Sequence, residues 1–243
     1  MTTDHDLHIE VNGERLLLDR SGAAYWPAER TLVFADLHFE KGSAMARRGS
    51  LLPPYDTRST IRRMEQTIAR FAPTRVIALG DSFHDGEADA RLDAEERAML
   101  TALAARGEWI WVEGNHDPKP PAWIGGIVAS QFARRGLVFR HLPTAQSGEV
   151  AGHLHPAATV TRRGTSVRRR CFVSDGARLL LPAFGAYAGG LDVRDEAIAS
   201  LFAGGCTAYA LGRERVYAVH ALRRNRNDDI QPSSTAIRTV ERP

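Results

Sequence analysis

Histidine and aspartate gather in four short groups along the first two thirds of the sequence. The groups are Asp36-Leu37-His38, Gly80-Asp81-Ser82-Phe83-His84-Asp85, Gly114-Asn115-His116-Asp117 and Gly152-His153-Leu154-His155. Imidazole, carboxylate and amide groups without thiolates favour borderline divalent ions such as Mn²⁺, Fe²⁺ or Zn²⁺. A GNHD tetrapeptide should arise by chance in only about one chain of this size per thousand. The pattern therefore predicts a centre for divalent metal ions.

The spacing within the groups fits two ions. Residues i and i+2 of an extended chain point to the same side, so Asp36 and His38 can converge on one ion. His153 and His155 have the same spacing. Their Cα atoms, ~6.5 Å apart, can supply one ligand to each of two ions separated by ~3.5–4 Å. Asp81 is the natural carboxylate to bridge them.

Each group directly follows a short apolar segment that we expect to be a buried strand. These segments are 31–35, 75–79, 109–112 and 149–151. Helices are expected at 41–48, from Asp56 or Thr57 to 71, and from 93 to 105, where Asp93 and Glu96 form a capping pattern. The alternation predicts an α/β fold in which the carboxyl edge of a sheet collects the four groups, as open α/β sheets do for ligands.

The remainder of the chain is richer in strands. We expect strands at 137–140, 158–161, 169–173, 207–211 and 216–220, a helix at 194–202, and an N-terminal hairpin that turns at Asn12-Gly13. No linker divides the sequence, so we expect one domain over residues 1–222. The polar, aperiodic residues 223–243 are expected to form a poorly ordered tail.

Composition indicates a globular cytoplasmic protein. The 243 residues include 32 Lys+Arg and 29 Asp+Glu, a net charge of +3, and 43% are hydrophobic, which is typical of folded domains. No stretch approaches the ~20 apolar residues of a membrane span, and the polar N-terminus is unlike a signal peptide. Cys171 and Cys206 lack the spacing of metal ligands, and we expect reduced thiols.

In their order along the chain, the four groups resemble the motifs of the calcineurin-like binuclear metallophosphoesterases: D-x-H, GDxx(D), GNH(D/E), H and GHxH. The single-histidine position is filled by His141. The resemblance implies a four-layer α/β/β/α sandwich with two mixed β-sheets. It implies a first ion held by Asp36, His38, Asp81 and His155, and a second held by Asp81, Asn115, His141 and His153. His116 would be the catalytic imidazole that binds no metal, with Asp117 orienting it or making it more basic.

Three further stretches, ADLHFEKG, GDSFHD and LLLPAFGAYAGGLDV, are similar to the ligase-associated DNA-damage-response endonucleases of that superfamily, the PdeM group. His84 stands at the second acidic position of GDxxD, as is typical of this group, and is expected to be catalytic. Leu142 stands where the group often has an acidic residue. The resemblance implies activity with Mn²⁺, and a ligase, a helicase and an exonuclease as partners in DNA repair.

Arginine is concentrated near the last predicted ligands. Residues 131–178 hold nine arginines against two acidic residues, a balance of +7. A basic rim would hold the backbone of a polynucleotide, with Arg162, Arg163 and Arg168 as candidate substrate-binding residues. The same charge also fits a solvated strand pair, because arginine supplies 30 of the 32 basic residues throughout the chain.

The leading hypothesis is a Mn²⁺-dependent endonuclease that cuts single-stranded or loop-containing DNA in DNA repair. Two divalent ions would activate water near neutral pH and stabilise charge on the phosphate. One alternative is a phosphodiesterase or phosphatase for small nucleotides or other small phosphoesters. Another is a binding module without catalysis. The sequence leaves the physiological metal, the preferred DNA structure and the oligomeric state open.

Overall fold

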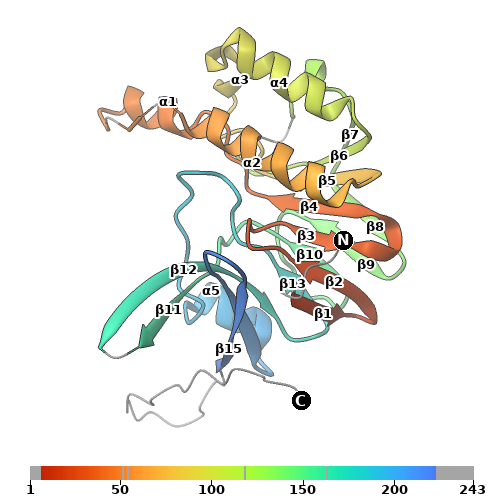
Figure 1. The fold of residues 1–243 in the computed structure, drawn as a ribbon, viewed down its shortest axis with the longest axis vertical. Helices are drawn as coiled ribbons and strands as arrows, with labels where there is room; N and C mark the ends of the chain where they lie inside the picture. The colour runs from red at the N-terminus through yellow and green to blue at the C-terminus, as the bar shows by residue number, and fades with distance from the viewer. Residues whose placement is uncertain (1–6, 51, 54, 118, 163, 223–243) are drawn as a thin grey trace.

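Two β-sheets pack face to face, with helices on the outer side of each (Figure 1). The computed structural model describes residues 7–50, 52–53, 55–117, 119–162 and 164–222. The first sheet has the strand order β1 (Leu7–Val11), β2 (Glu14–Leu18), β3 (Ala24–Trp26), β4 (Thr31–Ala35), β5 (Arg75–Leu79), β6 (Glu108–Val112) and β7 (Ile127–Ala129). Strands β1 to β4 are antiparallel, and β4 to β7 are parallel.

The second sheet is also mixed. Its order is β15 (Val216–Leu222), β14 (Cys206–Leu211), β12 (Thr165–Ser174), β13 (Leu179–Leu180), β10 (Glu149–Ala151), β9 (Leu137–Arg140) and β8 (Gln131–Arg134). β10 runs parallel to both β9 and β13, while the other pairs are antiparallel. β11 (Ala157–Arg162) lies outside this order and pairs with β12, and the two form a hairpin that projects from the body of the protein (Figure 1).

Three apolar clusters separate the layers. The helices are α1 (Lys41–Arg47), α2 (Asp56–Phe71), α3 (Ala88–Arg91), α4 (Ala94–Ala104) and α5 (Glu196–Ala199), with 3-10 turns η1 (Pro27–Glu29), η2 (Ala122–Ile124) and η3 (Ser200–Phe202). Ile61 and Met64 of α2 and Leu100 of α4 pack on the outer face of the first sheet. A second cluster, with Trp26 and Phe139, fills the space between the sheets. A third lies under α5 and η3. The result is the expected α/β/β/α sandwich.

Most elements expected from the sequence are present, with three differences. Asp56 begins α2 and does not cap it; its carboxylate accepts a hydrogen bond from the backbone N–H of Gly42 in α1, at 2.8 Å. Strand β12 begins at Thr165, four residues earlier than expected, because it pairs with β11 along its exposed half. Strands β3, β7, β8 and β13 and helix α3 were missed, and the helix expected at 194–202 is α5 followed by η3; each missed element has two to four residues, too few to show a period of its own.

Two further expectations concern the two cysteines and the C-terminal tail. Both Cys171 and Cys206 are buried free cysteines, as expected. The predicted tail, residues 223–243, lies outside the described residues, and the domain boundary at residue 222 stays a prediction. Among the described helices, none is both long and apolar enough to cross a membrane.

Candidate metal centre

The chain segments that follow β4, β5, β6, β9 and β10 meet at one end of the two sheets. Here the potential ligand atoms of Asp36, His38 and His155 lie within 4.8 Å of one another. Those of Asp81, His141 and His153 satisfy the same limit. We call these sets the first and second ligand groups. Each group takes side chains from loops of both sheets.

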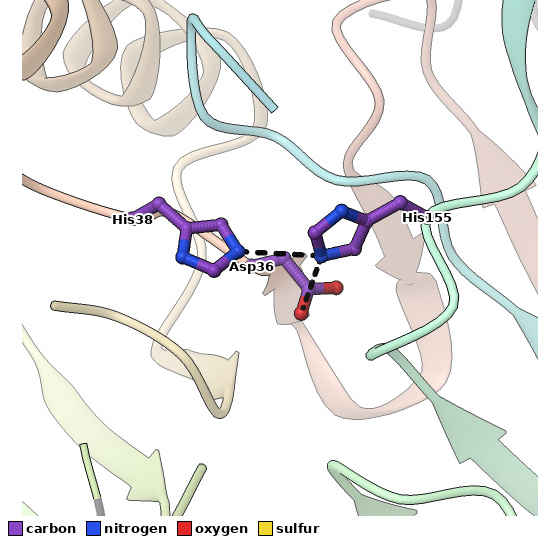
Figure 2. A group of neighbouring side chains, drawn as sticks. All are labelled: Asp36, His38 and His155. Atoms are coloured by element: carbon purple, nitrogen blue, oxygen red, sulfur yellow. Dashed lines mark hydrogen bonds and ion pairs between the residues drawn. The ribbon is translucent and has the colours of Figure 1, made fainter. Parts of the chain in front are cut away.

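The first ligand group is compact and mostly buried (Figure 2). The two Nε2 atoms of His38 and His155 are 3.3 Å apart, and His155 Nε2 is 3.2 Å from Asp36 Oδ1. Burial, with the nearby charges of His155 and Lys41, lowers the pKa of His38 to about 2. The His38 imidazole is therefore neutral, which is the form that binds metal ions.

Asn115 lies next to the second ligand group. His141 Nδ1 donates to the carbonyl oxygen of Leu79 at 3.0 Å, which leaves Nε2 as the ring atom that faces the group. That Nε2 lies 2.9 Å from Asn115 Oδ1, 3.2 Å from His153 Nδ1 and 3.4 Å from Asp81 Oδ1. Four predicted ligands of one ion thus point their donor atoms at a common position.

The carboxylate of Asp81 lies between the two groups. Oδ1 faces His141, and Oδ2 is 4.0 Å from His38 Nε2. Burial alone would raise the pKa of Asp81, but the hydrogen bond and charge of His141 and the N–H of His116 lower it to about 2. An ionised carboxylate that presents one oxygen to each group has the geometry of a bridging ligand.

The donor atoms fit divalent cations. Two nitrogens bound to the same ion at ~2.1 Å stand ~3.0–3.4 Å apart, and the Nε2 atoms of His38 and His155 are 3.3 Å apart. Carboxylate oxygens, an amide oxygen and imidazole nitrogens also suit ions of the Mn²⁺, Fe²⁺ and Zn²⁺ class. The seven predicted ligands are therefore chemically and geometrically able to hold two such ions.

Positive backbone φ angles, and not an extended chain, produce this convergence. Five of the seven predicted ligands have φ between 46° and 71°: Asp36, His38, Asp81, His153 and His155. The expectation that i, i+2 pairs converge through extended geometry was wrong in its mechanism, although the side chains do meet. A left-handed conformation costs roughly 1–2 kcal/mol for each non-glycine residue, so strain is concentrated at this site.

Adding Mn²⁺ to the metal-free protein is expected to raise its thermal midpoint. Ligands that bind only the folded state stabilise it, by about 2.7 kcal/mol for one site at a hundredfold excess over Kd. The measurement is calorimetry of chelator-treated protein across a Mn²⁺ titration. A midpoint that stays constant at millimolar Mn²⁺ would contradict the assignment of these residues as ligands.

An exposed imidazole, that of His116, lies beside the two groups. Its Nδ1 donates to the carbonyl oxygen of His84 at 2.8 Å, and its Nε2 is 3.9 Å from Asp81 Oδ2. The backbone N–H of His116 also donates to Asp81 Oδ1 at 2.9 Å. The side chain is 42% exposed, while that of Asp81 is buried. His116 is thus placed to reach a bound substrate with Nε2.

Asp117 has a different contact from the one expected. Its Oδ2 accepts the backbone N–H of Phe83 at 2.9 Å, and burial raises the pKa of its carboxyl to about 7. Within the described part of the chain, no hydrogen bond joins Asp117 to the His116 ring. The His84 carbonyl orients that ring instead, and Asp117 fixes the loop that follows Asp81.

The ring of His84 lies at the edge of the site. It stacks on His116 with ring centroids 5.4 Å apart, and its edge contact with His38 has a centroid distance of 5.5 Å. Burial, with the charges of Lys41 and His116, lowers the pKa of His84 to about 4. The structure thus places His84 in contact with a predicted ligand and with the predicted catalytic imidazole. Its catalytic role stays a prediction.

The predicted substrate-binding arginines lie on the β11–β12 hairpin. Arg163 falls outside the described residues, and only the backbone of Arg162 is described. Arg168 is exposed, and its guanidinium donates to the carbonyl oxygen of Gly190. The hairpin begins at Ala157, two residues after His155, and Arg170 of β12 pairs with Ala157 at the base of the hairpin.

Two arginines that the sequence analysis did not select hold the chain behind this group. Arg170 NH1 donates to the carbonyl oxygen of Ala183 at 2.7 Å and lies 3.3 Å from that of Phe184, and Arg63 also donates to the Phe184 carbonyl. The backbone N–H of Gly185 in turn donates to Asp36 O at 3.0 Å. Burial lowers the pKa of both arginines, and that of Arg63 falls to about 10. The role of these two arginines could not be predicted from the sequence, because no sequence pattern indicates which of the many arginines are buried.

Replacing Arg170 by methionine is expected to weaken Mn²⁺ binding at the first ligand group more than at the second, and to destabilise the fold by about 1–3 kcal/mol. The carbonyl groups that anchor the segment behind Asp36 would lose their donor. Electron paramagnetic resonance of a Mn²⁺ titration and thermal denaturation measure the two effects. Arg169→Met is the matched control, since Arg169 is exposed on the opposite face of β12. Equal behaviour of the two variants would contradict this role.

The fold and the site define the class of protein. The chain belongs to the calcineurin-like phosphoesterase family, whose sequence profile matches residues 29–178. It is therefore a metal-dependent phosphoesterase.

Among solved structures, the chain is similar to a nuclease, the Pseudomonas putida nuclease MPE. The identity is 28%, the match covers 88% of this chain and 99% of that chain, and the TM-score is 0.70. This agrees with the resemblance to the PdeM group of nucleases. YfcE, a phosphoesterase from E. coli, matches at 14% identity over 80% of this chain and 99% of its own, with a TM-score of 0.39. No curated protein matches the sequence.

Proposed function

We propose that this protein is a Mn²⁺-dependent endonuclease that cuts single-stranded or loop-containing DNA during DNA repair. The observation that carries the proposal is the convergence of two ligand groups on the shared carboxylate of Asp81, with the exposed ring of His116 beside them. The similarity to a nuclease over 88% of the chain favours a polynucleotide substrate.

The two ions would be held by the seven predicted ligands, and when bound they supply Lewis acidity toward a phosphodiester and lower the pKa of water. The protein's own groups do the rest. Asp81 and Asp36 carry the negative charge of the centre. His116, fixed through Nδ1, presents Nε2 to donate a proton to the leaving oxygen.

The β11–β12 hairpin supports a long substrate. Strand β12 is exposed from Thr165 to Arg169, and this half carries Arg168 and Arg169, one on each face of the strand. Phosphates of a polynucleotide backbone can lie along such a strand without base-specific contacts. The carboxylate, amide and imidazole donors are compatible with Mn²⁺. A ligase, a helicase and an exonuclease as partners stay predictions.

The proposal is tested with circular single-stranded DNA. The purified, chelator-treated protein should convert circles to linear products when Mn²⁺ is added, and should leave fully paired duplex largely intact. Circles have no ends, so their cleavage distinguishes internal cutting from end trimming. If the enzyme turns over bis(4-nitrophenyl) phosphate but leaves circles and linear strands intact, the alternative of a phosphodiesterase for small esters replaces the nuclease.

A further inference from the structure

A polar cleft of about 250 Å³ opens directly beside the second ligand group. Asn115 and His141, two of the predicted metal ligands, form part of its wall. The other lining residues that matter here are Glu113, Gln131, Arg140 and Leu142. If the phosphate of a substrate lies at the metal centre, a group attached to that phosphate can therefore enter this adjoining cleft.

The guanidinium in the cleft is already compensated by protein groups. Arg140 donates to Gln131 Oε1 and to Thr144 Oγ1, each at 3.0 Å, and its Nε is 3.5 Å from the carboxylate of buried Glu149. Because Oε1 of Gln131 accepts from Arg140, the amide group of Gln131 is oriented, and its NH₂ is left as a donor. The cleft thus offers an oriented amide, while the charge of Arg140 is balanced.

The remaining walls favour an uncharged group. Glu113 is exposed and lines the cleft, and a carboxylate there would repel a second phosphate and accept hydrogen bonds from hydroxyl or amino groups. Leu142 is 51% exposed and supplies an apolar surface on which a flat ring can pack. The basic hairpin directly follows His155, which is a member of the first ligand group. The cleft and the basic hairpin therefore adjoin different ligand groups.

We propose that this cleft binds one unpaired nucleoside, the one attached to the scissile phosphodiester on the side of the second ligand group. The base packs against Leu142 and meets the amide of Gln131, and Glu113 accepts from a hydroxyl or amino group. The inference rests on the proposed function and specifies its substrate. The cleft is smaller than the roughly 300–1,000 Å³ of pockets for drug-sized ligands, so a base pair does not fit. This size selects single strands and loops over duplex.

Kinetics with two esters test the subsite. Thymidine 5′-(4-nitrophenyl phosphate) carries a nucleoside, and bis(4-nitrophenyl) phosphate does not. Leu142→Ala and Gln131→Ala should each lower kcat/KM for the nucleotide ester about tenfold relative to kcat/KM for the nitrophenyl diester, mainly through KM. The control is Gln146→Ala, which removes an exposed glutamine outside the cleft. If the ratio of the two kcat/KM values is the same in all three variants, the subsite is excluded.

A binding measurement separates failure of the subsite from failure of the proposed function. Millimolar thymidine is titrated into metal-free protein while the NMR signals of the Leu142 methyl groups and the Gln131 side-chain amide are followed. Selective shifts of these signals support the subsite even if neither ester is hydrolysed, a result that would refute the phosphodiesterase alone. Hydrolysis of both esters without any such shift would retain the phosphodiesterase and overturn the subsite.

Discussion

The Asp81→Asn variant is expected to lose at least about 10³-fold in kcat for phosphodiester hydrolysis. The two carboxylate oxygens of Asp81 face the two ligand groups, one toward His141 and the other toward His38. Asparagine keeps the size of the side chain but replaces an anionic oxygen with an NH₂ group that cannot bind a cation. The variant should also bind less than two Mn²⁺ per chain. Single-turnover kinetics and metal analysis at saturation measure the two effects.

Asp85→Asn is the control for this prediction. Asp85 lies four residues later in the same loop, but its carboxylate is bound by Arg91 at 2.8 and 2.9 Å and belongs to neither ligand group. We expect this variant to retain two Mn²⁺ per chain and a rate within a few-fold of the wild type. Full metal content and nearly normal turnover in Asp81→Asn would remove the basis for a shared bridging ligand.

His116→Ala is expected to reduce kcat by about 10²–10⁴-fold while both ions stay bound. The ring has no place in either ligand group, and its Nε2 is held 3.9 Å from Asp81 Oδ2, beside both groups. The loss should be larger for DNA than for bis(4-nitrophenyl) phosphate, because a nitrophenolate leaves without needing a proton. Rates for both substrates, measured with matched metal content, test this.

A comparison with the nearby His84 ring sharpens the prediction. His84→Ala keeps the backbone carbonyl that orients His116, so it should cost less activity than His116→Ala. If both substitutions cost the same for both substrates, then His116 acts by packing and not by proton transfer.

The sequence was sufficient to predict the fold and the membership of the ligand groups. Short apolar segments that end at Asp36, Asp81 and Asn115 identify strand ends, and parallel pairing of β4, β5 and β6 brings those ends together. The separation of His153 and His155 into different groups was also expected from their spacing, although the backbone that achieves it is not extended. These features are local, so a pattern in the sequence can record them.

Features that depend on packing between distant segments could not be predicted. The positive φ of His38 and of His155 is imposed by the surrounding structure, since most residues other than glycine have negative φ. The contact of Asp117 with Phe83 needs two loops from neighbouring strands. The contact of Arg170 with the backbone near Phe184 needs the second sheet to be assembled. Both contacts join residues that are far apart in the sequence, so no periodic sequence pattern indicates them.

Each ligand group takes side chains from both sheets, and this ties the spacing of the donor atoms to the core between the sheets. Phe139 lies two residues before His141, is fully buried, and has its ring centroid 5.9 Å from that of Trp26 on the opposite sheet. If one sheet shifted relative to the other by about an ångström, the distances between the donor atoms would change in both ligand groups together. Apolar residues that contact neither a cation nor a substrate thus set the distances between the donor atoms of this enzyme. Substitutions in the core between the sheets can therefore change its catalytic rate.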